Sequence, residues 1–291
     1  MYRRLLAPLR ALSLLIICSL MPACDRVELA YRNLDVIIPW TLSDYLDMNA
    51  RQKTWFKERL GAHLRWHCST QLPGYLAWLD RVQQMVASNQ VNDQQLQARA
   101  QEAQKAMNDI AAAITPSAVE LLRGLDDEQV GEMRQAFARD VRQREERYVR
   151  TPMDEQIGNR AERMEKRLTP WLGELTPEQS RLVEAWSQSL IEQNRLSLDN
   201  RARWQAQMSA ALAQRQSPEF GQQIQRLLTN RQSVWTPQYR QFNARAEQAG
   251  RSLLVDLMQA STPAQRQHLQ ERLADVRKDF SELKCLKVAK S

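Results

Sequence analysis

The sequence predicts an all-α fold, an extended multi-helix bundle or array that contains one long helix and follows an N-terminal export signal. Glycine supplies only 8 of the 291 residues, and valine, isoleucine and threonine are sparse beside arginine and glutamine. Such a composition disfavours tight turns and strands and suits helices. The apolar fraction of 43% is enough to build a core, which excludes a disordered chain.

Residues 1–23 have the pattern of an export signal. Three arginines and no acid precede a mainly apolar run over residues 11–21, which is too short to span a bilayer. The end of this segment, Pro22-Ala23-Cys24, resembles a bacterial lipobox. The resemblance implies a lipoprotein signal peptide over residues 1–23 and acyl chains, such as palmitate, on Cys24 as the first mature residue. The alternatives are an ordinary cleaved signal with an incidental cysteine and an uncleaved anchor.

The charge balance argues against a nucleic-acid partner. The whole chain carries a formal net charge of +7, and removal of the three signal arginines lowers it to +4. An exported protein with such mixed charges is a poor candidate for binding nucleic acid. A lipid anchor instead implies attachment to the inner or outer membrane of the cell envelope, with the protein facing the periplasm. Two or more acyl chains hold a protein there stably.

Helical periodicity follows almost directly after Cys24 without a linker, so residues 24–291 are expected to form a single helical domain. Its weakest seam lies near residue 114. The longest expected helix covers residues 177–214 and would extend about 57 Å. Its apolar stripe fades at residues 192–195, where we expect a bend or a protrusion. The expected helices span residues 26–39, 50–68, 74–88, 93–113, 116–123, 127–149, 152–168, 177–214, 218–229, 237–259 and 263–287.

Proline and glutamine mark expected helix starts. Each of the seven prolines from residue 116 onward follows serine or threonine, a pair that suits an N-cap and the first helical position, so most are predicted to start helices. A glutamine three residues after a capping residue also recurs, as in a capping box. The spacing of these boxes is too irregular for a solenoid repeat. The four predicted boxes are Asn49–Gln52, Asp126–Gln129, Thr176–Gln179 and Thr262–Gln265.

Aromatic residues gather in the first helices, where residues 40–78 hold four of the eight tryptophans. One interpretation is an aromatic groove for a partner helix, an exposed peptide or a lipid. The other is an aromatic core at a helix junction, which is the commoner use of aromatics at helical spacing. The candidate partner-binding aromatics are Trp40, Tyr45, Trp55, Trp66 and Trp78.

The histidines and cysteines give one candidate bond and no metal site. His63 and His67 are four residues apart, a spacing that can share a metal. The stronger metallohydrolase pattern needs a glutamate after the first histidine, and leucine stands there instead. Once Cys24 is lipidated and the signal removed, Cys68 and Cys285 remain. An oxidising periplasm permits a disulfide between them, and two separate thiols are the alternative.

No pattern in the sequence indicates catalysis. A glycine-rich phosphate loop, a nucleophile elbow and an HExxH motif are all missing, so we expect a non-enzyme without a cofactor. A basic run is interpreted as a solvated helix face. The alternative for this run is contact with anionic lipid head groups. Its members are Arg139, Arg142, Arg144, Arg147 and Arg150.

Two resemblances bear on function. The first is to a family of uncharacterised proteobacterial helical lipoproteins, and it covers most of the mature chain. Because that family has no assigned activity, the resemblance implies no catalytic residue. The second is local, since Leu175-Thr176-Pro177-Glu178-Gln179 matches the LTxxQ motif of Spy/CpxP-type periplasmic chaperones, which cradle unfolded clients. The first resemblance is carried by Tyr31, Leu34, Asp35, Trp40, Asp44, Tyr45, Leu46, Gln52, His67, Leu72, Pro73, Tyr75 and Leu79.

We therefore expect a lipid-anchored periplasmic protein that binds or holds another envelope component through helix faces, in a chaperone-like manner. This hypothesis predicts an exposed apolar groove around Trp40, Trp55 and Trp66. The alternative is a structural adaptor at the membrane surface, which predicts a buried aromatic cluster and one apolar patch. An enzyme would instead need a pocket with perturbed titratable groups near His63 and His67.

Overall fold

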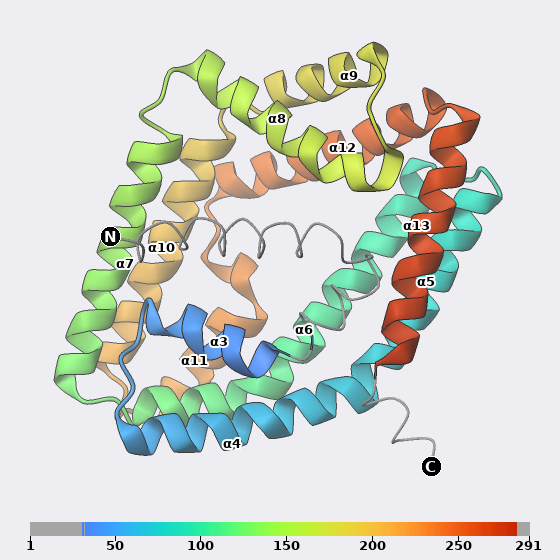
Figure 1. Ribbon diagram of the computed structural model, residues 1–291. Helices are drawn as coiled ribbons and strands as arrows, with labels where there is room; N and C mark the ends of the chain where they lie inside the picture. The colour runs from blue at the N-terminus through green and yellow to red at the C-terminus, as the bar shows by residue number, and fades with distance from the viewer. Residues whose placement is uncertain (1–30, 32, 284–291) are drawn as a thin grey trace, which may run out of the picture.

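The computed structural model describes residue 31 and residues 33–283, and this part of the chain is helical apart from short connections (Figure 1). The all-α prediction is confirmed, since no strand occurs among the described residues. None of their helices is long and apolar enough to cross a membrane. The α-helices are α3 (Leu34–Ser43), α4 (Ala50–Trp66), α5 (Leu72–Ala87), α6 (Asp93–Arg123), α7 (Asp127–Tyr148), α8 (Met153–Leu172), α9 (Pro177–Gln188), α10 (Gln193–Ala213), α11 (Phe220–Thr229), α12 (Pro237–Gln259) and α13 (Pro263–Glu282).

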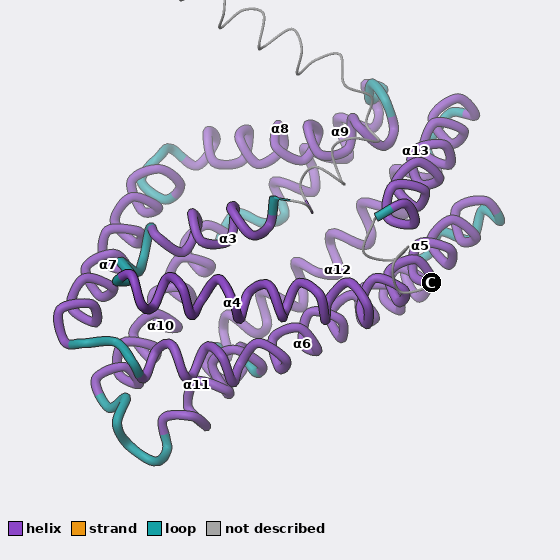
Figure 2. Tube along the Cα trace, turned by 60° about the horizontal axis from the view of Figure 1, so that its bottom comes forward, coloured by secondary structure: helices purple, strands orange, loops and turns teal. Residues whose placement is uncertain are grey.

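The helices associate in pairs, and the pairs form the sides of an open frame (Figure 1). Helix α7 packs on α10, α8 on α9, α13 on α5, and α6 on both α4 and α11. Figure 2 shows α3 beside α4, which in turn runs along α6. The buried apolar side chains accordingly fall into separate clusters, the largest of which surrounds Phe220 and Ile224 between α6, α7, α10 and α11.

The predicted long helix over residues 177–214 is wrong in its middle. Helix α9 ends at Gln188 and α10 begins at Gln193, at the place where the apolar stripe fades. The turn between them buries Leu190 against Phe242 of α12, and the hydroxyl of Ser189 donates to the carbonyl of Trp186 at 2.7 Å. The break between α9 and α10 therefore allows Leu190 to be buried against α12.

The longest α-helix in the described part of the chain is α6, which runs through the seam predicted near residue 114. Pro116 lies inside this helix, where it removes one backbone donor. The Thr115 hydroxyl donates to the carbonyl of Ala111 at 2.6 Å. Helices predicted over 93–113 and 116–123 are thus a single helix. A second join occurs at Pro73, because the π-helical turn η1 (His67–Gln71) connects α4 to α5 without a loop.

Only three of the seven serine–proline and threonine–proline pairs start a helix at the predicted cap. Thr176, Thr236 and Thr262 are the N-caps of α9, α12 and α13. Two other threonines, Thr115 and Thr169, lie inside helices and donate their hydroxyls to the carbonyl four residues earlier. The prediction that most pairs start helices is therefore wrong. A threonine hydroxyl can accept from a backbone amide at an N-cap or donate to a backbone carbonyl inside a helix, so the pair is compatible with both positions.

All four predicted capping boxes form, and they associate in two pairs. Gln52 and Gln129 donate to each other, with Nε2–Oε1 distances of 3.1 and 2.7 Å. Gln179 and Gln265 do the same at 3.1 and 2.9 Å. Each pair joins the N-termini of two helices that are distant in sequence, α4 with α7 and α9 with α13. We call these pairs the interlocked capping boxes.

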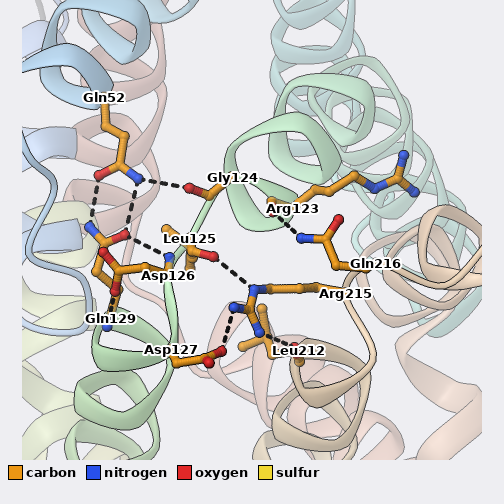
Figure 3. A network of polar contacts seen from close by, with 10 residues as sticks. All are labelled: Gln52, Arg123, Gly124, Leu125, Asp126, Asp127, Gln129, Leu212, Arg215 and Gln216. Atoms are coloured by element: carbon orange, nitrogen blue, oxygen red, sulfur yellow. Dashed lines mark hydrogen bonds and ion pairs between the residues drawn. The ribbon is translucent and has the colours of Figure 1, made fainter.

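Each interlocked glutamine also binds the loop that leads into the partner helix. Gln52 donates to the carbonyl of Gly124 at 3.2 Å (Figure 3). Gln129 donates to the carbonyl of Asp47 at 2.7 Å. Gln265 makes the equivalent contact with the loop before α9. Because each side-chain oxygen also accepts from its own cap amide, these three amide groups use all four of their hydrogen-bonding positions.

A partly buried carboxylate, that of Asp140, ties α7 to α10. Asp140 accepts hydrogen bonds from Arg144 at 2.8 Å, Arg201 at 2.5 Å, Gln205 at 3.0 Å and the Tyr45 hydroxyl at 3.3 Å. Burial alone would raise the pKa of Asp140. The hydrogen bonds from Arg201, Arg144 and Gln205 outweigh this effect and lower the pKa from 3.8 to about 2.

Replacing Gln179 by alanine should lower the free energy of unfolding by about 2 kcal/mol, because the change removes a capping box and leaves the buried Gln265 amide short of partners. Gln95→Ala is the matched control. Gln95 stands at the same position of α6, but its side chain makes no hydrogen bond with a described residue, so we expect less than about 0.5 kcal/mol. Urea unfolding measures both values. Equal losses for the two variants would contradict the importance of the interlocked pair.

Asp140→Asn should remove about 2 kcal/mol of stability at about pH 7, since the depressed pKa of Asp140 stabilises the folded state wherever the unfolded carboxyl is ionised. This contribution is present above the unfolded pKa of 3.8 and is lost as the pH falls through about 2. The difference between wild type and variant should therefore shrink over that range. Urea unfolding across the pH series tests this, and a difference independent of pH would contradict it.

Candidate functional site

An apolar groove of about 440 Å³ lies between α3, α4 and α6. Helix α3 contributes Leu34, Ile38 and Leu42, which share one face because they are four residues apart. Helix α6 contributes a second stripe that runs from Ile110 to Leu122. On both helices the lining residues recur every three to four positions, so each helix presents one apolar face to the groove. The accessible surface of the groove is almost entirely apolar.

Helix α4 supplies the aromatic wall of this groove, including Trp55 and Trp66. The indole nitrogen of Trp55 donates to Glu120 of α6 at 3.1 Å. The guanidinium of Arg59 lies over the Trp55 ring at 5.5 Å and pairs with the same glutamate. These contacts bridge α4 and α6, so they hold the two walls at a fixed separation while the ring keeps its apolar surface in the groove.

Two histidines lie on the α4 side of the groove, and both are held by hydroxyl groups. Nε2 of His63 is 2.9 Å from the Ser117 hydroxyl. His67 lies between the hydroxyls of Tyr31 and Tyr75, each at 3.1 Å. Burial lowers the pKa of both rings, and Arg59 lowers that of His63 further. Both rings are therefore neutral at neutral pH, and the groove gains no charge from them.

The histidines do not form a metal site with their surroundings in residues 31 and 33–283. No group of three or more histidine, cysteine, aspartate or glutamate side chains with metal-binding geometry occurs there. Both ring nitrogens of His67 make hydrogen bonds with tyrosine hydroxyls, so these contacts explain the orientation of the ring without a metal.

The outer side of α3 is also apolar, although it faces away from the groove. Trp40 is 71% exposed, Val36 61% and Ile37 42%. A helix that is apolar on both sides normally lies within a core. Here one side is solvent-exposed, which is typical of a surface that meets a partner or a membrane. We call these three residues the outer α3 face.

The other predicted site residues lie elsewhere. Trp78 donates its indole nitrogen to the carbonyl of Arg99 at 3.0 Å, between α5 and α6. Cys68 is buried and disulfide-bonded, and it packs with Leu283, two residues before Cys285. Cys24 and Cys285 lie outside the described residues. The lipid attachment and the Cys68–Cys285 bond therefore stay predictions.

A second cavity, of about 740 Å³, lies between α7, α8, α10 and the 3₁₀ turn η2 (Arg231–Val234). Tyr45 lines this cavity and not the groove. Of the predicted basic run, only Arg144 reaches it. A sequence signal was available on α8, where Arg163 and Arg167 are one turn apart. We call this site the arginine cavity, since its described lining has no acidic residue and includes Arg144, Arg163, Arg167, Arg201 and Arg231.

Comparison with known proteins identifies a family and no activity. Neither the search of curated proteins nor the search of solved structures found a match. A model of a family of unknown function, DUF6279, matches residues 44–240, which include α4 to α11, the Gln52–Gln129 pair and almost all of the arginine cavity. The expectation of an uncharacterised family is confirmed, whereas proteobacterial origin, lipoprotein character and likeness to Spy/CpxP chaperones stay predictions. The chain therefore belongs to the DUF6279 family.

Proposed function

We propose that this protein is a lipid-anchored, periplasm-facing binding protein that holds apolar segments of other envelope proteins in the groove between α3, α4 and α6. The observation that carries the proposal is the groove itself, with Trp55 and Trp66 in its lining. The proposed activity is chaperone-like and needs neither a catalytic residue nor a cofactor.

The shape and chemistry of the groove favour an apolar peptide segment. Its α6 wall runs from Ile110 to Leu122, a length of about 18 Å at the rise of an α-helix. That length matches two to three side chains of an extended or helical segment, and such grooves bind regularly spaced apolar anchors. Arg59 is the cation of the lining, so backbone carbonyls or an acidic residue of the segment can meet it at the edge.

The outer α3 face supports a position at the membrane surface. Leu34, the first residue of α3, follows the predicted anchor residue Cys24 by ten positions. Trp40 follows Cys24 by 16 positions in the chain, and a tryptophan suits the interface between head groups and acyl chains. In this proposal Val36, Ile37 and Trp40 face the bilayer and the groove faces the periplasm.

The same outer face favours a second candidate function. A structural adaptor at the membrane surface would use Trp40 to bind a stable partner and would have no need of the groove. The two functions differ in the client, because an adaptor binds a folded protein and a chaperone-like protein binds exposed apolar segments.

Ile114→Glu should weaken client binding about tenfold, because the change places a carboxylate in an apolar lining. Ile114 is partly exposed and belongs to none of the buried clusters, so the fold should tolerate the change. The measurement is light scattering from an unfolded, aggregating model protein, mixed at equal molar amounts with the mature chain carrying Cys24→Ser, which cannot be lipidated.

Met107→Glu is the matched control for this experiment, since Met107 is an exposed apolar residue on the same helix outside the groove. We expect it to suppress aggregation as well as the parent chain does. If the parent chain leaves aggregation unaffected, or if Ile114→Glu protects equally well, the chaperone-like proposal is wrong.

Cys24→Ala should release the protein from the membrane fraction, because the acyl chains provide most of the binding energy for the bilayer. Met107→Ala is the control, because Met107 is exposed and takes no part in a disulfide, and this variant should leave the protein membrane-bound. Fractionation of cells fed a palmitate analogue measures both location and label. Wild-type protein without label, or a Cys24→Ala variant that stays in the membranes, would refute the lipid anchor.

A further inference from the structure

The arginine cavity concentrates positive charge, and neighbouring Asp140 pairs with only two of its five arginines. Arg163, Arg167 and Arg231 make no ion pair with a described carboxylate, whereas Arg144 and Arg201 bind Asp140 behind the cavity wall. Three cations that are unpaired among the described residues lie in the lining of one cavity and attract an anion. The planar guanidinium group suits a phosphate or a carboxylate, because it can donate two parallel hydrogen bonds.

Aromatic rings position two of these cations. The guanidinium of Arg163 lies 5.9 Å from the centre of the Tyr148 ring, and that of Arg231 lies 5.6 Å from the Trp204 ring. Such cation–π contacts restrict the arginine side chains before a ligand arrives. Trp235 adds another ring to the lining. The cavity therefore offers apolar ring faces beside its charges.

The lining also contains acceptor oxygens without donors. Gln205 is only 4% exposed, and its amide nitrogen donates to Asp140 at 3.0 Å. Its side-chain oxygen has no hydrogen-bond partner among the described residues, and neither do the side-chain oxygens of Gln193 and Asn200. All three residues line the cavity. These oxygens are covered by protein atoms in the structure. Because an unpartnered buried acceptor is costly, a ligand that carries hydroxyl or amide donors is favoured once these side chains turn their oxygens into the cavity.

We propose that the arginine cavity binds an anionic carbohydrate, a sugar that carries a phosphate or a carboxylate. The arginines meet the anion, the amide side chains turn their unpartnered oxygens to accept from hydroxyl groups, and the aromatic rings pack against the C–H face of the sugar. The volume of about 740 Å³ is in the range of small-molecule sites. This proposal does not rest on the proposed client binding, although the cavity and the groove share Leu42, Leu122 and Met133.

Calorimetric titration of the full chain in detergent tests the proposal with four probes: a neutral sugar, an anion without a sugar, and two sugars that carry an anionic group. These are glucose, inorganic phosphate, glucose 1-phosphate and glucuronic acid. We expect at least one of the two sugar anions to bind about tenfold more tightly than both glucose and inorganic phosphate. The tighter sugar anion identifies the charged group. Absence of sugar-anion binding, or equal binding of inorganic phosphate, would overturn the proposal.

Matched variants locate the binding in the cavity. The double variant Arg163→Gln and Arg167→Gln should weaken sugar-anion binding about tenfold, whereas Arg142→Gln on the exposed side of α7 should leave it unchanged. Asn200→Ala should weaken it about threefold through loss of one hydroxyl acceptor. If the double variant binds as tightly as the wild type, or if Arg142→Gln is equally weakened, the arginine cavity is not the site.

Discussion

The interlocked capping boxes are the constraint on which the arrangement of helices depends. Two helix N-termini that meet face each other with their positive dipole ends, which is unfavourable unless acceptors lie between them. A glutamine at the third helical position supplies such an acceptor and also a donor for its partner. Glutamate would lack the donor and alanine would lack both. Gln52–Gln129 and Gln179–Gln265 therefore hold α4 to α7 and α9 to α13 end to end.

Both candidate sites inherit their shape from the first of these pairs. The pair fixes the start of α4 against the turn between α6 and α7, so it sets the angle between two walls of the apolar groove (Figure 3). The same turn is bound from the other side by Arg215, which donates to the Leu125 carbonyl at 2.7 Å and to Asp127 at 2.6 Å. Because Arg215 lies two residues after the end of α10, a wall of the arginine cavity is tied to the same point.

The features that depend on residues close together in the sequence could be predicted, whereas the contacts between distant residues could not. A capping box lies within four residues, so all four were predictable, but their association needs residues that are far apart in the chain. Thr115 and Thr169 lie inside helices instead of at N-caps. Whether a helix continues through a threonine–proline pair depends on its tertiary packing, which the pair itself does not specify. The clustering of tryptophans in residues 40–78 left a groove and an aromatic core open, and the structure places Trp55 and Trp66 in the lining of the groove but Trp40 on the outer α3 face. The arginine cavity draws Arg163 and Arg231 from separate elements, and the unpartnered oxygen of Gln205 has no signature in a sequence.

The groove and the arginine cavity are not independent in shape, because they share part of their lining. Leu42, Leu122 and Met133 belong to both. Methionine adapts readily to its surroundings, and here Met133 is buried between the two sites. A ligand that displaces its side chain from one site therefore changes the volume of the other. By thermodynamic reciprocity, any such effect of a bound sugar on a client equals the effect of the client on the sugar. Leu42, Leu122 and Met133 are therefore where any coupling between the two proposed sites would arise.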